Sequence, residues 1–172
     1  TLKALPPEMA ERYTASEFLG KGGFARVFKV QSPDGSWAAL KIPIFLDEVT
    51  GRSFIAELQN WTSLIHENIV RVQDYNIMPF PYFEMELCDG ALSELEKPVS
   101  PDQVAWLIFN VCEGLKCAHT HGILHRDLKP QNIMLRNGIP KITDWGLSKV
   151  MTQSRTTTVS GGFTAYYAAP EQ

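Results

Sequence analysis

The stretch GILHRDLKPQNIML, residues 122–135, decides how this sequence is interpreted. It places Asp127, Lys129 and Asn132 within six residues, with Arg126 before them and an apolar run after them. A carboxylate can accept or orient a proton, an ammonium can neutralise a charged group, and an amide oxygen suits a hard cation such as Mg²⁺. Such a set on a loop that leads into a strand predicts a site for chemistry.

Length and composition narrow the class of protein. The 172 residues allow one domain with a hydrophobic core, or a small lobe with part of a larger one. The net charge of −3 and the scattered basic side chains argue against a nucleic-acid surface, because phosphate backbones need clustered Lys and Arg. No segment is apolar enough for a signal peptide or a membrane span, so we expect a cytoplasmic protein without a membrane partner.

The cysteines indicate a reducing environment. Cys88, Cys112 and Cys117 are odd in number and show no CxxC spacing, which argues against a disulfide framework. We expect Cys112 and Cys117 to pack within one helix. Cys117 with His119, His121 and His125 could suggest a zinc site, but we interpret these side chains as surface and packing residues.

The first half of the chain is typical of a meander of strands. After a lead-in at residues 1–12, β-type runs cover 13–20, 25–32 and 36–43, and further strands are predicted near 69–75 and 82–87. Between them, apolar residues recur at helical spacing over about 50–65, which predicts an amphipathic helix.

The second half begins with a helix signal. Ser100 followed by Pro101 and Gln103 is a capping pattern, and apolar periodicity continues to Ala118. Short strands are predicted at 133–136 and 140–143, joined by the hairpin turn Asn137-Gly138. Residues 148–164 are rich in Ser, Thr and Gly, which predicts a mobile loop.

Three further features admit both a functional and a plain structural interpretation. The glycines of residues 20–23 could let backbone N–H groups approach an anion or could simply form a turn, and a Rossmann site is excluded because a strand follows them. Lys41 lies among apolar residues and could pair with Glu57 or reach solvent at the strand end. Asp144, before Trp145-Gly146, could be a second ligand of a hard cation or could cap a turn.

Taken in order, these motifs resemble a eukaryotic-type protein kinase. The order is the glycine turn, Lys41, Glu57, His125-Arg126-Asp127 with Asn132, Asp144-Trp145-Gly146 and Ala169-Pro170-Glu171. The similarity runs from about Tyr13 to Gln172. It implies an α+β, two-lobe fold: an antiparallel five-stranded N-lobe with one helix at 13–87, and a hinge with an incomplete helical C-lobe at 88–172.

The resemblance also implies a function and its cofactors, ATP and Mg²⁺. The chain would transfer the γ-phosphate of ATP to Ser or Thr hydroxyls of protein substrates. Asp127 would be the catalytic base, Lys129 would steady the γ-phosphate, and Asn132 and Asp144 would hold Mg²⁺. ATP-binding residues, by the same resemblance, would be Gly20, Lys21, Gly22, Val27, Ala39, Lys41, Met85, Glu86, Cys88 and Met134, with Glu57 as the partner of Lys41.

Regulation and specificity are implied in the same way. Arg126 beside Asp127 implies control by phosphorylation of the 148–164 loop, at Ser160 or Thr158, by an upstream kinase or by trans-autophosphorylation. Lys129-Pro130, and Thr164 before residues 169–171, resemble the Ser/Thr-specific version of the motifs.

The sequence also departs from the family pattern. Trp145 replaces the usual Phe, and we expect it to pack through Trp61 and His125. The sequence stops one residue after Glu171, so we expect a truncated domain that transfers phosphate poorly. We also expect the helix to leave Trp106, Leu107 and Val111 uncovered, which favours self-association. The alternatives are a pseudokinase or scaffold without catalysis, and a small-molecule kinase.

Overall fold

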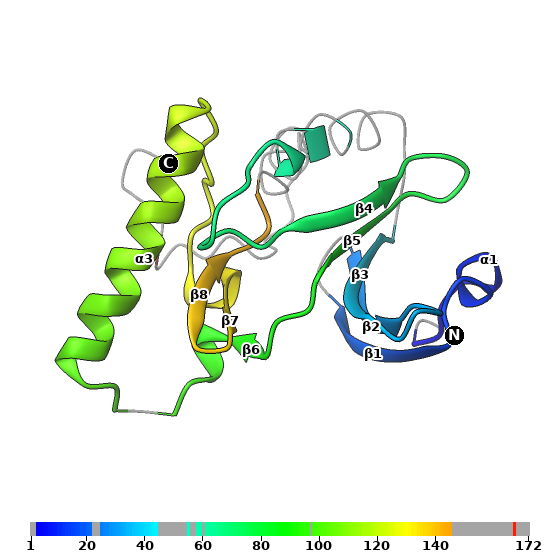
Figure 1. Ribbon diagram of the computed structural model, residues 1–172, viewed down its shortest axis with the longest axis horizontal. Coiled ribbons are helices and arrows are strands. Elements are labelled where there is room, and N and C mark those ends of the chain that lie inside the picture. The colour runs from blue at the N-terminus through cyan, green and yellow to red at the C-terminus, as the bar shows by residue number, and fades with distance from the viewer. Residues whose placement is uncertain are drawn as a thin grey trace, which may run out of the picture. The chain divides into compact units, whose positions relative to one another are not determined.

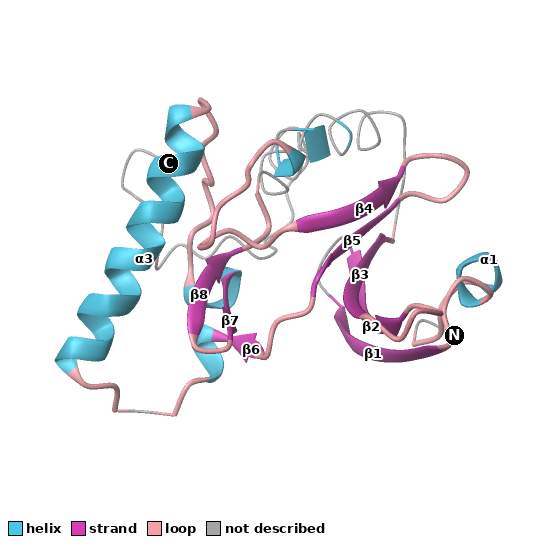
Figure 2. Ribbon diagram, viewed as in Figure 1, coloured by secondary structure: helices cyan, strands magenta, loops and turns pink. Residues whose placement is uncertain are grey.

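The computed structural model describes residues 3–21, 25–44, 55, 58–59, 61–96, 98–145 and 167 (Figures 1 and 2). The chain forms two compact units. The first comprises Thr1–Asp47 and Val72–Leu87, and the second comprises Glu48–Arg71 and Cys88–Gln172. Among the helices in the described ranges, none has the length and apolar character needed to cross a membrane.

The first unit is built on a five-stranded antiparallel sheet. Its strands are β1 (Ala15–Lys21), β2 (Ala25–Gln31), β3 (Trp37–Pro43), β4 (Val72–Asn76) and β5 (Tyr82–Glu86), in the order β1-β2-β3-β5-β4. The five predicted strands are confirmed, but β4 begins later than residue 69. The reason is that Ile69 instead forms a parallel bridge with Ile142 of the second unit's own sheet.

One face of this sheet is covered by the start of the chain. Along β2 and β3, Phe28, Val30, Ala38, Leu40 and Ile42 alternate onto this face and are buried. They form a core with Met9, Tyr13 and Tyr82. Sequence reasoning treated residues 1–12 as a lead-in and missed the helix α1 (Pro7–Ala10), whose four residues are too few to show a period.

The second unit contains the long helix α3 (Pro101–Thr120). The predicted capping box is confirmed, since the Gln103 amide donates to Ser100 Oγ at 3.3 Å and the Ser100 amide donates to Gln103 Oε1 at 3.1 Å. The helix ends two residues after the predicted Ala118. The chain then turns at Gly122, whose φ of 72° is readily adopted only by glycine.

The buried face of α3 differs in part from the prediction. Val111, Gly114 and Ala118 are buried, and the helix packs against β8. The expectation of an uncovered Val111 is therefore wrong, whereas Trp106 is exposed and Leu107 is half-buried. Cys112 is exposed rather than packed, because one helical step places it about 100° round the helix from Val111.

The second unit also contains a small sheet, whose strands lie before and after residues 125–132 in the chain. Its strands are β6 (Gly90–Ala91), β7 (Ile133–Arg136) and β8 (Ile139–Ile142), in the order β6-β7-β8. The hairpin turn is confirmed: Asn137 and Gly138 have φ of 51° and 79°, as a type I′ turn requires. Short 3₁₀ turns lie at Leu92–Glu94 and Pro130–Asn132.

The amphipathic helix predicted over 50–65 lies only partly within the described residues. Ile55, Leu58, Gln59, Trp61 and Thr62 are helical. Trp61 is 1% exposed, and its indole Nε1 donates to the Val70 carbonyl at 2.9 Å. This bond fastens the helical segment to the chain that follows it.

Candidate active site

Thr143 joins the two segments that carry the predicted metal ligands. Its carbonyl lies 2.8 Å from Nε2 of His125, and its amide donates to the Asn132 carbonyl at 3.0 Å. Asp144 follows directly in the chain. The carbonyl and the amide of Thr143 therefore hold the start of the Asp144 segment against both ends of the 125–132 loop.

His125 is neutral in this arrangement. A carbonyl can only accept, so Nε2 carries the proton that is donated to Thr143, and Nδ1 accepts from the Asp127 amide at 3.3 Å. The ring is 3% exposed. Burial lowers the pKa of His125, although the Thr143 carbonyl and the carboxylates of Asp144 and Asp127 oppose this effect. His125 thus serves as a fixed link between the loop and the Asp144 segment.

The Asp127 side chain is held by two neighbours. Lys129 Nζ lies 2.7 Å from Asp127 Oδ2, and Asn132 Nδ2 donates to the same oxygen at 3.1 Å. The same Asn132 side-chain nitrogen, Nδ2, also donates to the Asp127 backbone carbonyl at 2.8 Å. Asn132 is buried, whereas the side chains of Asp127 and Lys129 are 32% and 19% exposed. The carboxylate is therefore oriented and still reachable from solvent.

Two residues of this region adopt the left-handed backbone conformation. Arg126 and Asp144 both have a φ of 64°. Aspartate adopts this conformation more readily than most residues, but an arginine there is uncommon. Backbone conformations of this kind concentrate at functional sites, where the surrounding structure holds them.

Trp145 is buried beside His125. The two rings meet edge to face, with centroids 4.9 Å apart and an interplanar angle of 64°, and Trp145 is 1% exposed. This confirms the predicted packing on His125. Within the described part of the chain, the Nε1–H of Trp145 has no hydrogen-bond partner.

The first unit gathers four predicted residues on the sheet face opposite the core. Val27 pairs with Lys41 across β2 and β3, and Ala39 pairs with Met85 across β3 and β5. Strand alternation places all four on one face. Lys41 is only 8% exposed there.

Comparisons with known proteins agree with this architecture. The model of the protein kinase domain matches residues 13–172. The chain belongs to the protein kinase family. The serine/threonine-protein kinase PknB of Mycobacterium leprae is 31% identical over 183 residues, which cover 97% of this chain and 29% of that protein. The mitogen-activated protein kinase sty1 of Schizosaccharomyces pombe is 33% identical over 172 residues, covering 95% of this chain and 48% of that protein.

The chain thus spans between about three tenths and half of the length of these kinases. The family assignment and the antiparallel five-stranded sheet confirm the predicted kinase fold class.

The structure describes some residues of the kinase motifs and not others. Within the second unit, Asp127, Lys129, Asn132 and the chain at Asp144 come together through the contacts above. Gly20 and Lys21 lie at the end of β1, paired with Val27 and Arg26, rather than in a turn. Several predicted residues lie outside the described ranges, namely Gly22, Glu57, Thr158, Ser160, Thr164 and residues 169–171.

Met134 lies in β7, opposite Lys141, and Glu86 ends β5. Cys88 follows β5 and is half-buried. The roles assigned to these three residues stay predictions.

Sequence reasoning missed Thr143. It acts through its backbone carbonyl and amide, and backbone groups leave no mark on residue type. Its position before Asp144 is the signal that could have drawn attention to it.

The donor set fits Mg²⁺. Asn132 turns its amide nitrogen toward Asp127, which leaves the amide oxygen as the ligand atom, and Asp144 supplies a carboxylate. Within the described residues, no group of three or more His, Cys, Asp or Glu side chains could hold a metal. Mg²⁺ is usually bound by one or two protein oxygens together with substrate phosphates, so two ligands suffice.

Proposed function

We propose that this kinase is an Mg-ATP-dependent protein kinase that phosphorylates Ser or Thr hydroxyls of protein substrates. The observation that carries the proposal is the loop in which Lys129 and Asn132 both hold Oδ2 of Asp127 while Thr143 fastens Asn132 to the Asp144 segment. A base and a cation on one loop, with one oxygen ligand on that loop and another on the segment fastened to it, are groups that phosphoryl transfer requires.

In the proposed reaction, Asp127 accepts the hydrogen bond of the attacking Ser or Thr hydroxyl and takes up its proton. The hydroxyl oxygen forms a bond to the γ-phosphorus, and the bond between that phosphorus and the β–γ bridging oxygen breaks, so ADP leaves. Lys129 lies beside the carboxylate and supplies a positive charge for the transferred phosphoryl group.

Asn132 and Asp144 would hold Mg²⁺. The ion, when bound, neutralises charge on the phosphate oxygens. The protein's part is to fix its two ligands, and the Thr143 bonds to His125 and Asn132 do this through the backbone.

The first unit would contribute the nucleotide contacts. Lys41 would bind the α- and β-phosphates, paired with Glu57, and Val27 and Ala39 would contact the adenine with Met134. Met85 would limit the depth of the adenine site, and Glu86 to Cys88 would pair with the adenine edge. The shared sheet face of Val27, Ala39, Lys41 and Met85 supports these roles.

The proposal extends to specificity and regulation. The Lys129-Pro130 pair and the names of the relatives favour Ser/Thr over Tyr substrates. Phosphorylation at Ser160 or Thr158, a cytoplasmic location and self-association stay predictions.

The rival function is a scaffold that binds nucleotide and partners without catalysis. The presence of Lys41, Asp127, Asn132 and Asp144 argues against it, because each would be free to change in such a protein.

Transfer of label from γ-labelled ATP to a generic protein substrate tests the proposal. We expect Mg²⁺-dependent transfer by the wild type and its loss in Asp144→Asn, because Asn keeps the left-handed backbone and removes only the charge. Asp127→Asn should also lose transfer. Nucleotide binding without transfer by the wild type would favour the scaffold, and equal transfer by all three proteins would reject the assigned roles.

A further inference from the structure

The chain start is an integral part of the first unit. Met9 and Tyr13 are 5% and 8% exposed and belong to the core that covers one sheet face, and Leu5 packs against that core. We call residues 3–13 the strap. Its apolar side chains fill a face that β2 and β3 would otherwise expose to water.

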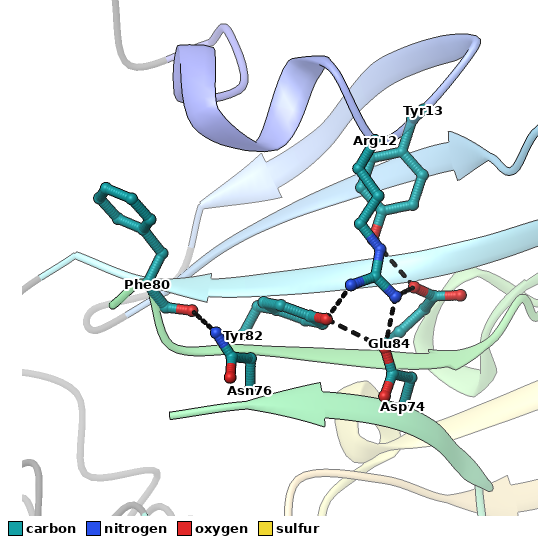
Figure 3. Close-up of polar contacts among 7 residues, drawn as sticks. All are labelled: Arg12, Tyr13, Asp74, Asn76, Phe80, Tyr82 and Glu84. Atoms are coloured by element: carbon teal, nitrogen blue, oxygen red, sulfur yellow. Dashed lines mark hydrogen bonds and ion pairs between the residues drawn. The ribbon is translucent and has the colours of Figure 1, made fainter. Parts of the chain in front are cut away.

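Arg12 fastens the strap to β4 and β5 (Figure 3). Its guanidinium donates to the Tyr82 hydroxyl and forms an ion pair with Asp74, and its Nη2 lies 3.6 Å from Glu84 Oε2. The Tyr82 hydroxyl donates to Asp74 Oδ2 at 3.0 Å. Tyr13 adds a second link from the strap, donating to Glu84 Oε2 at 2.9 Å.

The charges of this cluster favour one arrangement at neutral pH. Burial and the hydrogen bond to Asp74 raise the pKa of Tyr82 to about 12, so the phenol stays neutral. Burial alone would raise the pKa of Asp74, but the hydrogen bonds from Arg12 and Tyr82 outweigh it and the pKa is lowered. Arg12 is thus the cation between two carboxylates, and removing it leaves them facing each other unneutralised.

The strap also contacts both ends of β2. The Arg26 guanidinium donates to the Ala4 carbonyl at 3.4 Å near the start of the strand. Where the strap ends, the Thr14 amide donates to the Gln31 carbonyl at 2.9 Å. Strand β2 follows the glycine-containing segment 20–23, so Arg26, which contacts the strap at Ala4, lies close in sequence to the proposed nucleotide contacts.

The two faces of the sheet are linked by strand geometry. Residues that contact the strap alternate along β2 and β3 with Val27, Ala39 and Lys41. Val27 and Lys41 are paired across the two strands. A shift of the packed face therefore moves the opposite face with it, because close-packed cores transmit displacement rather than absorb it.

We propose that the strap, fastened by Arg12, sets the geometry of the sheet face that binds ATP, so that Arg12 is a positioning residue for nucleotide binding. This inference rests on the proposed function. Arg12 acts through Tyr82, Asp74 and the packed core, and it lies on the face that does not carry Lys41.

Steady-state kinetics with Arg12→Met tests the proposal. We expect the KM for ATP to rise about fivefold or more, the lower end of typical coupling between sites, while kcat is unchanged. Hydrogen exchange of the amides of residues 9–14 should accelerate. Lys116→Met is the matched control, because Lys116 is an exposed cation on α3 that forms an ion pair with Glu113 three residues away, and it should change neither readout.

Two milder variants keep the test valid if Arg12→Met does not fold. Tyr82→Phe keeps the ring in the core and removes only the hydroxyl that joins Arg12 to Asp74, so it should raise the KM for ATP by a smaller factor. Arg12→Lys keeps the charge without the fork of donors and should restore part of the affinity.

The outcomes separate this inference from the function on which it rests. An active enzyme whose KM for ATP is unchanged in Arg12→Met and Tyr82→Phe, despite faster exchange in residues 9–14, would overturn the strap's role alone. A fall in kcat with an unchanged KM would overturn it as well. A wild type that neither binds nor hydrolyses ATP would overturn both proposals.

Discussion

Lys129 Nζ lies 2.7 Å from Oδ2 of Asp127, the same oxygen that accepts from the Asn132 amide. The proposed base is therefore held from two sides within its own loop. Both side chains of the ion pair are partly exposed, so the pair adds little to the free energy of unfolding. Its value is positional and electrostatic, and this gives the first prediction.

Lys129→Met is expected to lower kcat without unfolding the protein. Removing one group that stabilises transition-state charge typically costs about 10²-fold in kcat. The free energy of unfolding should change by less than about 1 kcal/mol, the usual limit for an exposed ion pair. Phosphate transfer and urea unfolding measure the two quantities. Lys116→Met is the control, and a kcat equal to wild type would remove Lys129 from the mechanism.

The two buried tryptophans should respond differently to the same substitution. Trp61 and Trp145 are each 1% exposed, but the Trp61 indole donates to Val70 whereas that of Trp145 lacks a partner in the described residues. Both changes to Phe delete the same atoms. Trp61→Phe also removes the indole donor of the buried Val70 carbonyl, so it should cost about 1–3 kcal/mol more than Trp145→Phe. Equal losses in urea unfolding would contradict this.

Gly114→Ala should destabilise the second unit even though alanine favours helices. A Cβ at Gly114 would lie 2.8 Å from the Asn68 carbonyl oxygen and 3.1 Å from Ile142 Cδ1. Helix propensity gains about 1 kcal/mol, but overpacking a core costs about 1–3 kcal/mol, so we expect a net loss of about 1 kcal/mol. Cys112→Ala, exposed on the same helix, is the control. A rise in melting temperature for Gly114→Ala would show that α3 can move away.

Stability should fall as the pH drops below about 6.5, because of His125. Its pKa is lowered in the folded protein, chiefly by burial, so the unfolded chain binds the proton more readily. The stabilisation is fully present above the ordinary histidine pKa and is lost as the pH falls through the folded pKa. The slope for one proton cannot exceed about 1.4 kcal/mol per pH unit.

Urea unfolding at pH 7.5 and 5.5 measures this effect, each pH being chosen on one side of the ordinary histidine pKa of about 6.5. His125→Asn should lose stability at both pH values but show a smaller difference between them. His119→Asn, at an exposed position on α3, should keep the wild-type difference. An undiminished difference in His125→Asn would assign the pH dependence to other groups.

Sequence patterns predicted the elements that depend on local chemistry. The capping box at Ser100 and the Asn137-Gly138 turn are local features, and both are confirmed. Runs of residues that favour strands likewise located β2 and β3 correctly. The loop of Asp127, Lys129 and Asn132 was found because side chains of those types at that spacing are rarely needed for packing.

What the sequence could not reveal depends on distant partners or on the backbone. Arg12 finds Asp74 and Tyr82 some sixty to seventy positions away, and no local pattern marks it. Cys112 and Val111 are neighbours in the chain, yet only the packing of α3 on β8 decides which of them is buried. The parallel bridge between Ile69 and Ile142 is a similar long-range contact, and it delays the start of β4.

The two bonds of Thr143 have a consequence for anyone who would exchange parts between kinases. The Thr143 amide donates to the Asn132 carbonyl, and the Thr143 carbonyl accepts from His125. Residues 125–132 and 143–145 should therefore be transferred together. A chimaera that received residues 143–145 beside a loop without His125 would leave the Thr143 carbonyl without its imidazole donor.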